Sequence, residues 1–74
     1  MSPDKLVYMA NQIGRFFAHE ADEKAILDIA DHLKKFWDPR MRRAIFAYVD
    51  DGGQGLQPRA LKAVQALKAA TPSA

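Results

Sequence analysis

Residues 34–43 read "KKFWDPRMRR", and this stretch predicts the end of one helix and the start of another. The residue before a proline is pushed out of the α region of backbone space, so the preceding helix should end near Trp37. Asp38 is a good N-cap, and Pro39 suits the first turn of a helix because its missing N–H would have no partner there. The fold is therefore expected to be built from helices that meet at this junction.

The chain before the junction predicts two helices. Ser2 and Pro3 repeat the cap-then-proline signal, and apolar residues then recur at spacings of three and four, which is typical of a helix with one buried face. In the first helix these residues are Leu6, Met9, Ile13 and Phe16, with Phe17 at the edge of the stripe. In the second they are Ile26, Ile29, Leu33 and Phe36.

Gly14 interrupts the first stripe. Glycine in a helix interior costs about 1 kcal/mol relative to alanine, so its presence here has two interpretations. Either a neighbouring helix crosses close to it, or the glycine is merely tolerated. Replacement by alanine should lower the melting temperature in the first case and raise it in the second.

Two further helices are predicted after the junction. The third carries Met41, Ile45, Tyr48 and Val49 on its apolar face and ends at the glycine run in residues 50–55. The fourth starts at Pro58, carries Leu61, Val64 and Leu67, and is rich in alanine. Residues from about 70 to 74 should fray. Since no alternating β pattern appears, the prediction is a single all-α domain over residues 1–74, a small bundle of three firm helices plus a weaker C-terminal fourth.

Length and composition point to a chain that depends on another molecule. With 74 residues and 8.3 kDa, it buries only about 60% of its unfolded surface on folding. It has no cysteine for disulfides, and its two histidines, His19 and His32, do not have the spacing of a zinc site. No signal peptide or membrane-spanning stretch is apparent, so we expect a soluble, cytoplasmic protein that gains stability from a partner.

The positive charge is concentrated at the junction. Residues 34–43 hold five basic side chains and one acidic one, a net charge of +4, whereas the whole chain has +2, so the remainder is −2. Arg40, Arg42 and Arg43 stand at the N-terminus of a predicted helix, where the helix dipole is already positive. Something negative should therefore dock there, either phosphate groups or the carboxylates of a protein. The alternative function is accordingly a free-standing helical nucleic-acid-binding protein that uses the Lys34 to Arg43 patch.

Catalytic and cofactor-binding sites are not predicted. Asp28 and Asp31 share a helix face beside His32 and have the residue types of an acid–base pair, but such groups are more often solvated surface charge. The run "DDGGQG" at residues 50–55 lacks the spacing of a phosphate-binding loop, and its aspartates would repel phosphate. We therefore expect no enzymatic activity and no catalytic, metal or cofactor residues in this chain.

Tryptophan and arginine side by side are typical of protein interfaces, where truncating one such anchor costs about 2 kcal/mol or more. An equally weighted alternative is that Trp37 covers the small core while the arginines are a solvated face. On the first interpretation the partner-binding residues are Trp37, Asp38, Pro39, Arg40, Met41, Arg42 and Arg43.

Three segments together have a family resemblance. "KLVYMANQIGRFFA", "IADHLKKFWDPRMRRAIFAYV" and "GGQGLQPRALKAV", in this order, resemble the delta subunit of the cytoplasmic, molybdenum-containing, NAD-dependent formate dehydrogenases over about residues 5–66. Gln57 departs from the family, in which an acidic cap before Pro58 is expected, and this predicts a weaker start of the last helix.

The resemblance implies a non-catalytic accessory subunit that binds the large catalytic subunit and supports assembly or stability of the active enzyme. It also implies that the complex carries a molybdenum cofactor, iron–sulfur clusters, FMN and NAD, none of them in this chain. When isolated, the chain is a candidate homodimer, because its uncovered apolar surface can pair with a second copy.

Overall fold

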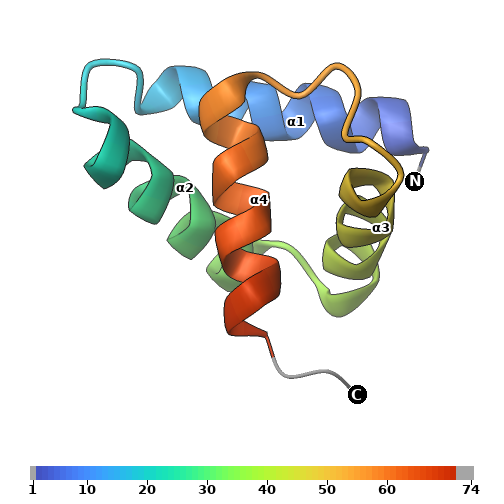
Figure 1. Ribbon diagram of the computed structural model, residues 1–74. Helices are drawn as coiled ribbons and strands as arrows, with labels where there is room; N and C mark the ends of the chain where they lie inside the picture. Colours follow the sequence, from blue (N-terminus) through green and yellow to red (C-terminus); the bar gives the residue numbers. More distant parts are fainter. Residues whose placement is uncertain (1, 72–74) are drawn as a thin grey trace.

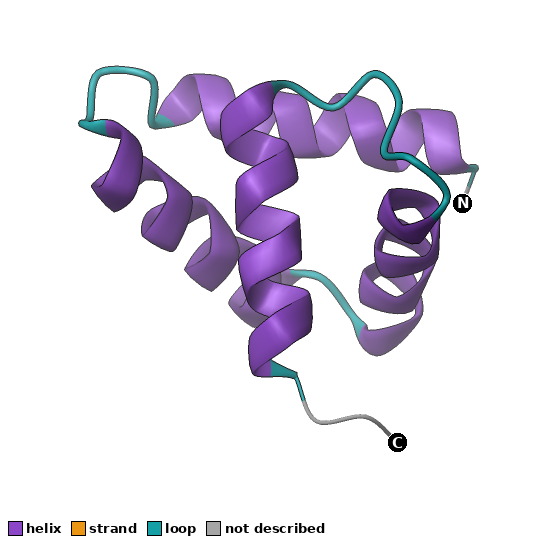
Figure 2. Ribbon diagram, viewed as in Figure 1, coloured by secondary structure: helices purple, strands orange, loops and turns teal. Residues whose placement is uncertain are grey.

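The computed structural model describes residues 2–71, and within them every regular element is a helix (Figure 2). The four helices are α1 (Pro3–Phe16), α2 (Asp22–Phe36), α3 (Pro39–Asp50) and α4 (Pro58–Ala70). The all-α prediction is confirmed. Of the expected frayed tail, Ala70 is still helical and Thr71 follows it, while residues 72–74 lie outside the described residues.

α4 is the helix that ties the others together. It lies across α1 and α2 with α3 at its other side (Figure 1), and it contacts all three helices, α2 most extensively. The radius of gyration is 11.0 Å, close to the value of about 11 Å expected for a compact chain of this length. The last helix, whose sequence signal is the weakest, is thus a full helix of 13 residues at the centre of the packing.

The core consists of apolar side chains from all four helices. Its largest fully buried members are Leu6, Ile29, Leu33, Ile45 and Val64, and within residues 2–71 no charged or polar residue is buried with them. Four alanines, Ala10, Ala25, Ala60 and Ala63, are also almost completely buried. Small side chains at these points let helices approach closely, which explains how the alanine-rich α4 can occupy the centre of the core.

Two phenylalanines that the stripes placed in the core are at the surface. Phe16 is 74% exposed and Phe36 is 71% exposed, so both predictions of burial are wrong. In each case the next residue in the chain faces the core instead: Phe17 packs against it in place of Phe16, and Trp37 is buried at 5% exposure in place of Phe36. Both positions lie at a helix end, where the chain turns away and the periodic pattern no longer fixes which side chain faces inward.

The predicted caps at the helix starts are confirmed in two cases. Ser2 accepts a hydrogen bond from the Lys5 amide at 3.4 Å, and the Asp38 carboxylate accepts one from the Met41 amide at 2.9 Å. Gln57, as expected, gives α4 no side-chain cap. Its own backbone N–H instead donates to Asn11 Oδ1 at 2.9 Å, which ties the start of α4 to α1.

The glycine run ends α3 and turns the chain toward α4. The Gly52 and Gly53 amides donate to the carbonyls of Val49 and Tyr48, both at 3.0 Å, and Gly52 has φ +117°. This pattern is a Schellman motif, which satisfies the last carbonyls of a helix and requires a left-handed residue. The Tyr48 hydroxyl donates to the Gln54 carbonyl at 2.6 Å, and the run is an ordinary turn between helices.

Candidate functional site

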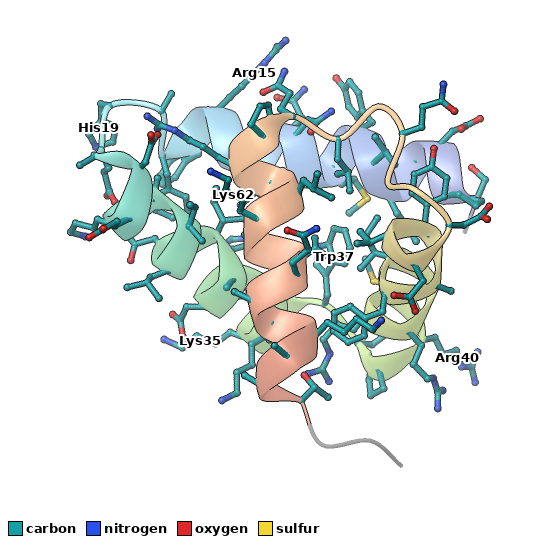
Figure 3. The ribbon with its side chains drawn as sticks, in the orientation of Figure 1. Arg15, His19, Lys35, Trp37, Arg40 and Lys62 are labelled. Atoms are coloured by element: carbon teal, nitrogen blue, oxygen red, sulfur yellow. The ribbon has the colours of Figure 1, made fainter. Side chains whose placement is uncertain are left out.

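The indole of Trp37 belongs to the core. It is 5% exposed and lies between the helices of the bundle (Figure 3). Of the two alternatives for this residue, the isolated chain adopts the one in which Trp37 covers the core, and its role toward a partner stays a prediction. Its neighbour Phe36 projects from the surface, at 71% exposure.

The three arginines after the junction have no carboxylate partner. Arg40 and Arg43 are exposed and Arg42 is half-buried, and none of them forms an ion pair within residues 2–71. Figure 3 shows Arg40 pointing away from the helices. The Nε of Arg42 is buried and has no hydrogen-bond partner. The carboxylate of the cap Asp38 lies at the same helix end but forms no ion pair with the arginines, so within residues 2–71 it balances their positive charge only in part.

Four other basic side chains are paired within residues 2–71, whereas Lys5, Arg15, Lys34 and Lys62 form no ion pair there, as the three arginines do not. Ion pairs join Lys24 to Glu20 and Asp28, Lys35 to Asp31, Arg59 to Asp22, and Lys68 to Asp50. The lack of an ion pair is therefore not special to the three arginines, and what distinguishes them is their grouping near the start of one helix, whose first turn holds no acidic residue.

A groove with one mixed and one mainly apolar hollow lies beside the junction, and we call it the Met41 groove. It consists of two adjoining hollows of about 330 and 380 Å³ that share Met41 as a lining residue. The smaller hollow is lined by Leu6, Asp38, Arg40, Met41 and Ala44. The larger is lined by Met9, Gln12, Ile13, His32, Phe36, Trp37 and Met41.

The junction residues are divided between two sides of α3. Arg40 and Met41 line the Met41 groove with Asp38, while Trp37 forms part of its floor. Arg42, Arg43 and Pro39 instead line a small hollow of about 130 Å³ with Phe46 and Thr71. The seven residues singled out from the sequence are therefore neighbours along the chain, but they do not form one continuous face.

The sequence does not predict that α1 forms one wall of the groove. Met9 and Ile13 were assigned to the core, yet both are half-buried and line the larger hollow. On the opposite wall the His32 and Phe36 rings lie 4.6 Å apart between centroids. The sequence does contain a signal for this exposed wall. Its apolar stripes hold more large residues than a core of this size can bury, so some of those residues must lie at the surface.

The groups weighed as an acid–base pair are held by lysines one helical turn away. Asp28 accepts a hydrogen bond from Lys24 and Asp31 pairs with Lys35, each at 2.9 Å. Hydrogen bonds with Glu20 and Lys24 hold the pKa of Asp28 below its usual range. A carboxylate with a lowered pKa is a poor proton acceptor at neutral pH. Within residues 2–71 no three His, Cys, Asp or Glu side chains are grouped as a metal site would need.

Comparison with known families identifies the chain. The family model of the NADH-dependent formate dehydrogenase delta subunit, FdsD, matches residues 5–64, which is most of the sequence. The protein belongs to the FdsD family. The three segments that carry the sequence resemblance fall within this match, and so does the whole junction. A comparison with curated proteins and one with solved structures find no match.

Membership of the FdsD family makes this chain a delta subunit of NAD-dependent formate dehydrogenase, whose partners are the other subunits of that enzyme. The chain contains no cysteine, and so it has no thiolate with which to ligate an iron–sulfur cluster. Among the described residues there is no helix of the length and apolar character needed to cross a membrane.

Proposed function

We propose that this FdsD chain is a non-catalytic accessory subunit that binds the large, molybdenum-containing subunit of a cytoplasmic formate dehydrogenase and supports assembly or stability of the active enzyme. The chain itself holds no redox cofactor, whereas the complex carries the molybdenum cofactor, iron–sulfur clusters, FMN and NAD. Family membership over residues 5–64 is the observation that carries this proposal.

The unpaired arginines support a binding role. Three cations at the positive end of a helix dipole repel one another and the dipole, so a partner that supplies carboxylates there is favoured electrostatically. Phe36, which lines the Met41 groove as Arg40 does, is a large apolar side chain left in water. A surface with both features has the composition of a protein interface, in which arginine and aromatic residues are enriched.

Co-purification with the large subunit tests the proposal. The large subunit is expressed with an affinity tag together with this chain, either unchanged or carrying Arg40→Glu and Arg43→Glu. We expect the unchanged chain to co-purify and the double variant to be lost from the complex. A variant with two other exposed, unpaired cations reversed, Arg15→Glu and Lys62→Glu, is the control for net charge and should be retained.

The double variant is suitable because it should leave the fold intact. Glutamate at position 40, in the first turn of α3, interacts favourably with the dipole, and position 43 is exposed. The helix content of the double variant should therefore equal that of the unchanged chain by circular dichroism. The proposal is wrong if the unchanged chain fails to co-purify with the large subunit.

The supporting role has its own measurement. The large subunit is produced with and without this chain, and its molybdenum content and formate-dependent NAD⁺ reduction are compared. We expect both to fall without the chain, while the isolated chain shows no activity. Molybdenum content and activity that do not change would contradict a role in assembly or stability.

The same unpaired arginines are the observation that favours the nucleic-acid alternative. Its test is a salt titration of the isolated chain against generic duplex DNA. Submicromolar affinity that falls steeply with salt, as counterion release requires, would favour the alternative. We expect weak binding, because the rest of the chain carries a net charge of −2.

A further inference from the structure

The shape of the Met41 groove selects an elongated apolar partner. Its two hollows adjoin at Met41, with α1 on one side and the end of α2 and the start of α3 on the other. Each hollow, at about 330 and 380 Å³, has room for a large apolar side chain. A slot between helices with two successive hollows is the form in which proteins receive an amphipathic helix, whose side chains at i and i+3 or i+4 enter neighbouring hollows.

The two ends of the groove differ in charge. At the end with Leu6 and Ala44, Arg40 lines the hollow and has no ion pair within residues 2–71. Lys5, which precedes the lining residue Leu6 on α1, is exposed and has no ion pair there either. The carboxylate there, Asp38, is occupied as the cap of the Met41 amide. Asp38 keeps its negative charge but forms no ion pair with Arg40, so Arg40 is free to pair with a carboxylate of a partner.

The other end of the groove is apolar. Met9, Ile13 and Phe36 surround the larger hollow. Phe16, which follows Gln12 by one turn on α1 and is exposed, extends the apolar surface beyond it. The nearby acidic residue on the outer face of α2, Asp31, is already paired with Lys35.

We propose that the Met41 groove binds an amphipathic helical segment of the large subunit. Large apolar side chains of that segment fill the two hollows, and its carboxylates lie at the end with Arg40 and Lys5. Phe36 is the central anchor on this chain, and Trp37 supports the groove from below. This inference rests on the proposed function and specifies the chemistry of the partner surface.

Photo-cross-linking in the complex tests which molecule occupies the groove. A photoreactive phenylalanine replaces Phe36, and the control places it at Leu27, a residue of α2 with similar exposure, 67%, that lines none of these hollows. We expect the probe at position 36 to join a large-subunit peptide with two apolar residues three or four positions apart and at least two Asp or Glu residues. The probe at position 27 should not join that peptide.

Two cross-linking results would overturn the proposal. One is a cross-link from position 36 to a second copy of this chain or to nucleic acid. The other is a cross-link to a large-subunit peptide without carboxylates.

Affinity measurements separate the failure of this inference from the failure of the proposed function. Phe36→Ala should weaken binding to the purified large subunit by about thirtyfold, and Arg40→Glu by about tenfold or more. Leu27→Ala and Lys62→Glu, the matched controls, should bind as the unchanged chain does. An Asp or Glu to Arg change in the cross-linked peptide should restore the binding of the Arg40→Glu variant.

If the unchanged chain binds and the Phe36 and Arg40 variants bind equally well, the groove is not the interface although the proposed function stands. If the unchanged chain does not bind the large subunit at all, the proposed function fails, and the assignment of the groove fails with it.

Discussion

At the scale of single residues, Phe36 and Trp37 are adjacent in the chain and have opposite surroundings. Trp37→Ala should destabilise the protein by about 3–5 kcal/mol, because it opens a cavity in the core. Phe36→Ala should change the stability by less than about 0.5 kcal/mol, because that ring is 71% exposed. Urea unfolding of the isolated chain, followed by circular dichroism, measures both. Equal losses for the two variants would contradict the assigned exposures.

The glycines at positions 14 and 53 should respond in opposite ways to alanine. A Cβ on Gly14 would lie 3.8 Å from Ile29 Cδ1 and 4.0 Å from Ala60 Cβ, which is ordinary contact. Helices do cross near Gly14, but they leave room for a methyl group. Gly14→Ala should therefore raise stability by about 0.5–1 kcal/mol, and the melting temperature by a few degrees.

Gly53→Ala should lower the stability, in contrast to Gly14→Ala. Gly53 has φ +62°, and a Cβ there would lie 2.8 Å from Leu61 Cδ1, so the change should cost about 1 kcal/mol or more. Thermal unfolding followed by circular dichroism measures both variants. A melting temperature that falls on Gly14→Ala would show that the crossing is tighter than these distances indicate.

At the scale of helices, local chemistry explains which parts of the fold were predictable. The caps at Ser2 and Asp38, and the end of α2 before Pro39, depend on residues within one turn, so the sequence alone locates them. The register of the buried faces depends on the neighbouring helices. In α1 the buried residues are Leu6, Val7 and Ala10, and Phe17 packs against the core just after the helix. A stripe built from large residues overlooks the alanine and selects Phe16 instead of Phe17.

The same distinction applies to the candidate site. The unpaired charge at Arg40, Arg42 and Arg43 was predictable, because an arginine cluster at a helix start with one acidic neighbour is visible in the sequence. The groove was not predictable, because it forms only where Met9 and Ile13 of α1 meet the junction, more than twenty positions away along the chain.

The uncapped start of α4 offers a stabilising change. Gln57 provides no side-chain hydrogen bond to the first turn. Gln57→Asp should stabilise the protein by about 0.5–1 kcal/mol, because an aspartate caps the free amides and interacts with the helix dipole. Gln57→Ala should be neutral. Urea unfolding of the three proteins compares them, and a loss of stability with Asp would mean that the contact between Asn11 and the Gln57 amide does not tolerate the charge.

The group of Glu20, just before α2, with Lys24 and Asp28 of α2 should make a small, pH-dependent contribution to stability. Hydrogen bonds with Glu20 and Lys24 lower the pKa of Asp28 from 3.8, and the bond to Asp28 raises the pKa of Lys24 from 10.5. A lowered carboxyl pKa stabilises the folded state above the unfolded pKa, and this contribution is lost as the pH falls through the folded pKa. A raised lysine pKa stabilises below the unfolded pKa, and its contribution is lost as the pH rises through the folded one.

Lys24→Met tests this dependence. The melting temperature of the variant should lie below that of the unchanged chain at pH 7, and the difference should shrink as the pH falls below 3.8 or rises above 10.5. Lys62→Met, which removes an exposed and unpaired charge, is the control and should show no such dependence. A difference that stays constant from pH 2 to pH 7 would contradict the assigned pKa of Asp28.

At the scale of the whole molecule, a chain of 74 residues has a small core and modest stability of its own. A partner that binds only the folded state stabilises it by mass action, by about 2.7 kcal/mol when its free concentration is 100 times Kd. Amides of the core in α2 and α4, which exchange hydrogen only when the chain unfolds, should therefore exchange about 100-fold more slowly in the presence of the large subunit at that concentration.

Hydrogen exchange with mass spectrometry measures this effect on peptides of this chain alone, so unfolding of the large subunit does not interfere. Arg40→Glu should leave the exchange of the isolated chain almost unchanged and should reduce the protection gained from the large subunit, because the groove then repels the partner's carboxylates. Raising the salt concentration should reduce the protection of the unchanged chain as well, since exposed charges are screened. Core exchange that is equally fast with and without the large subunit would mean that the FdsD chain reaches its full stability alone, and that its unpaired arginines do not face that partner.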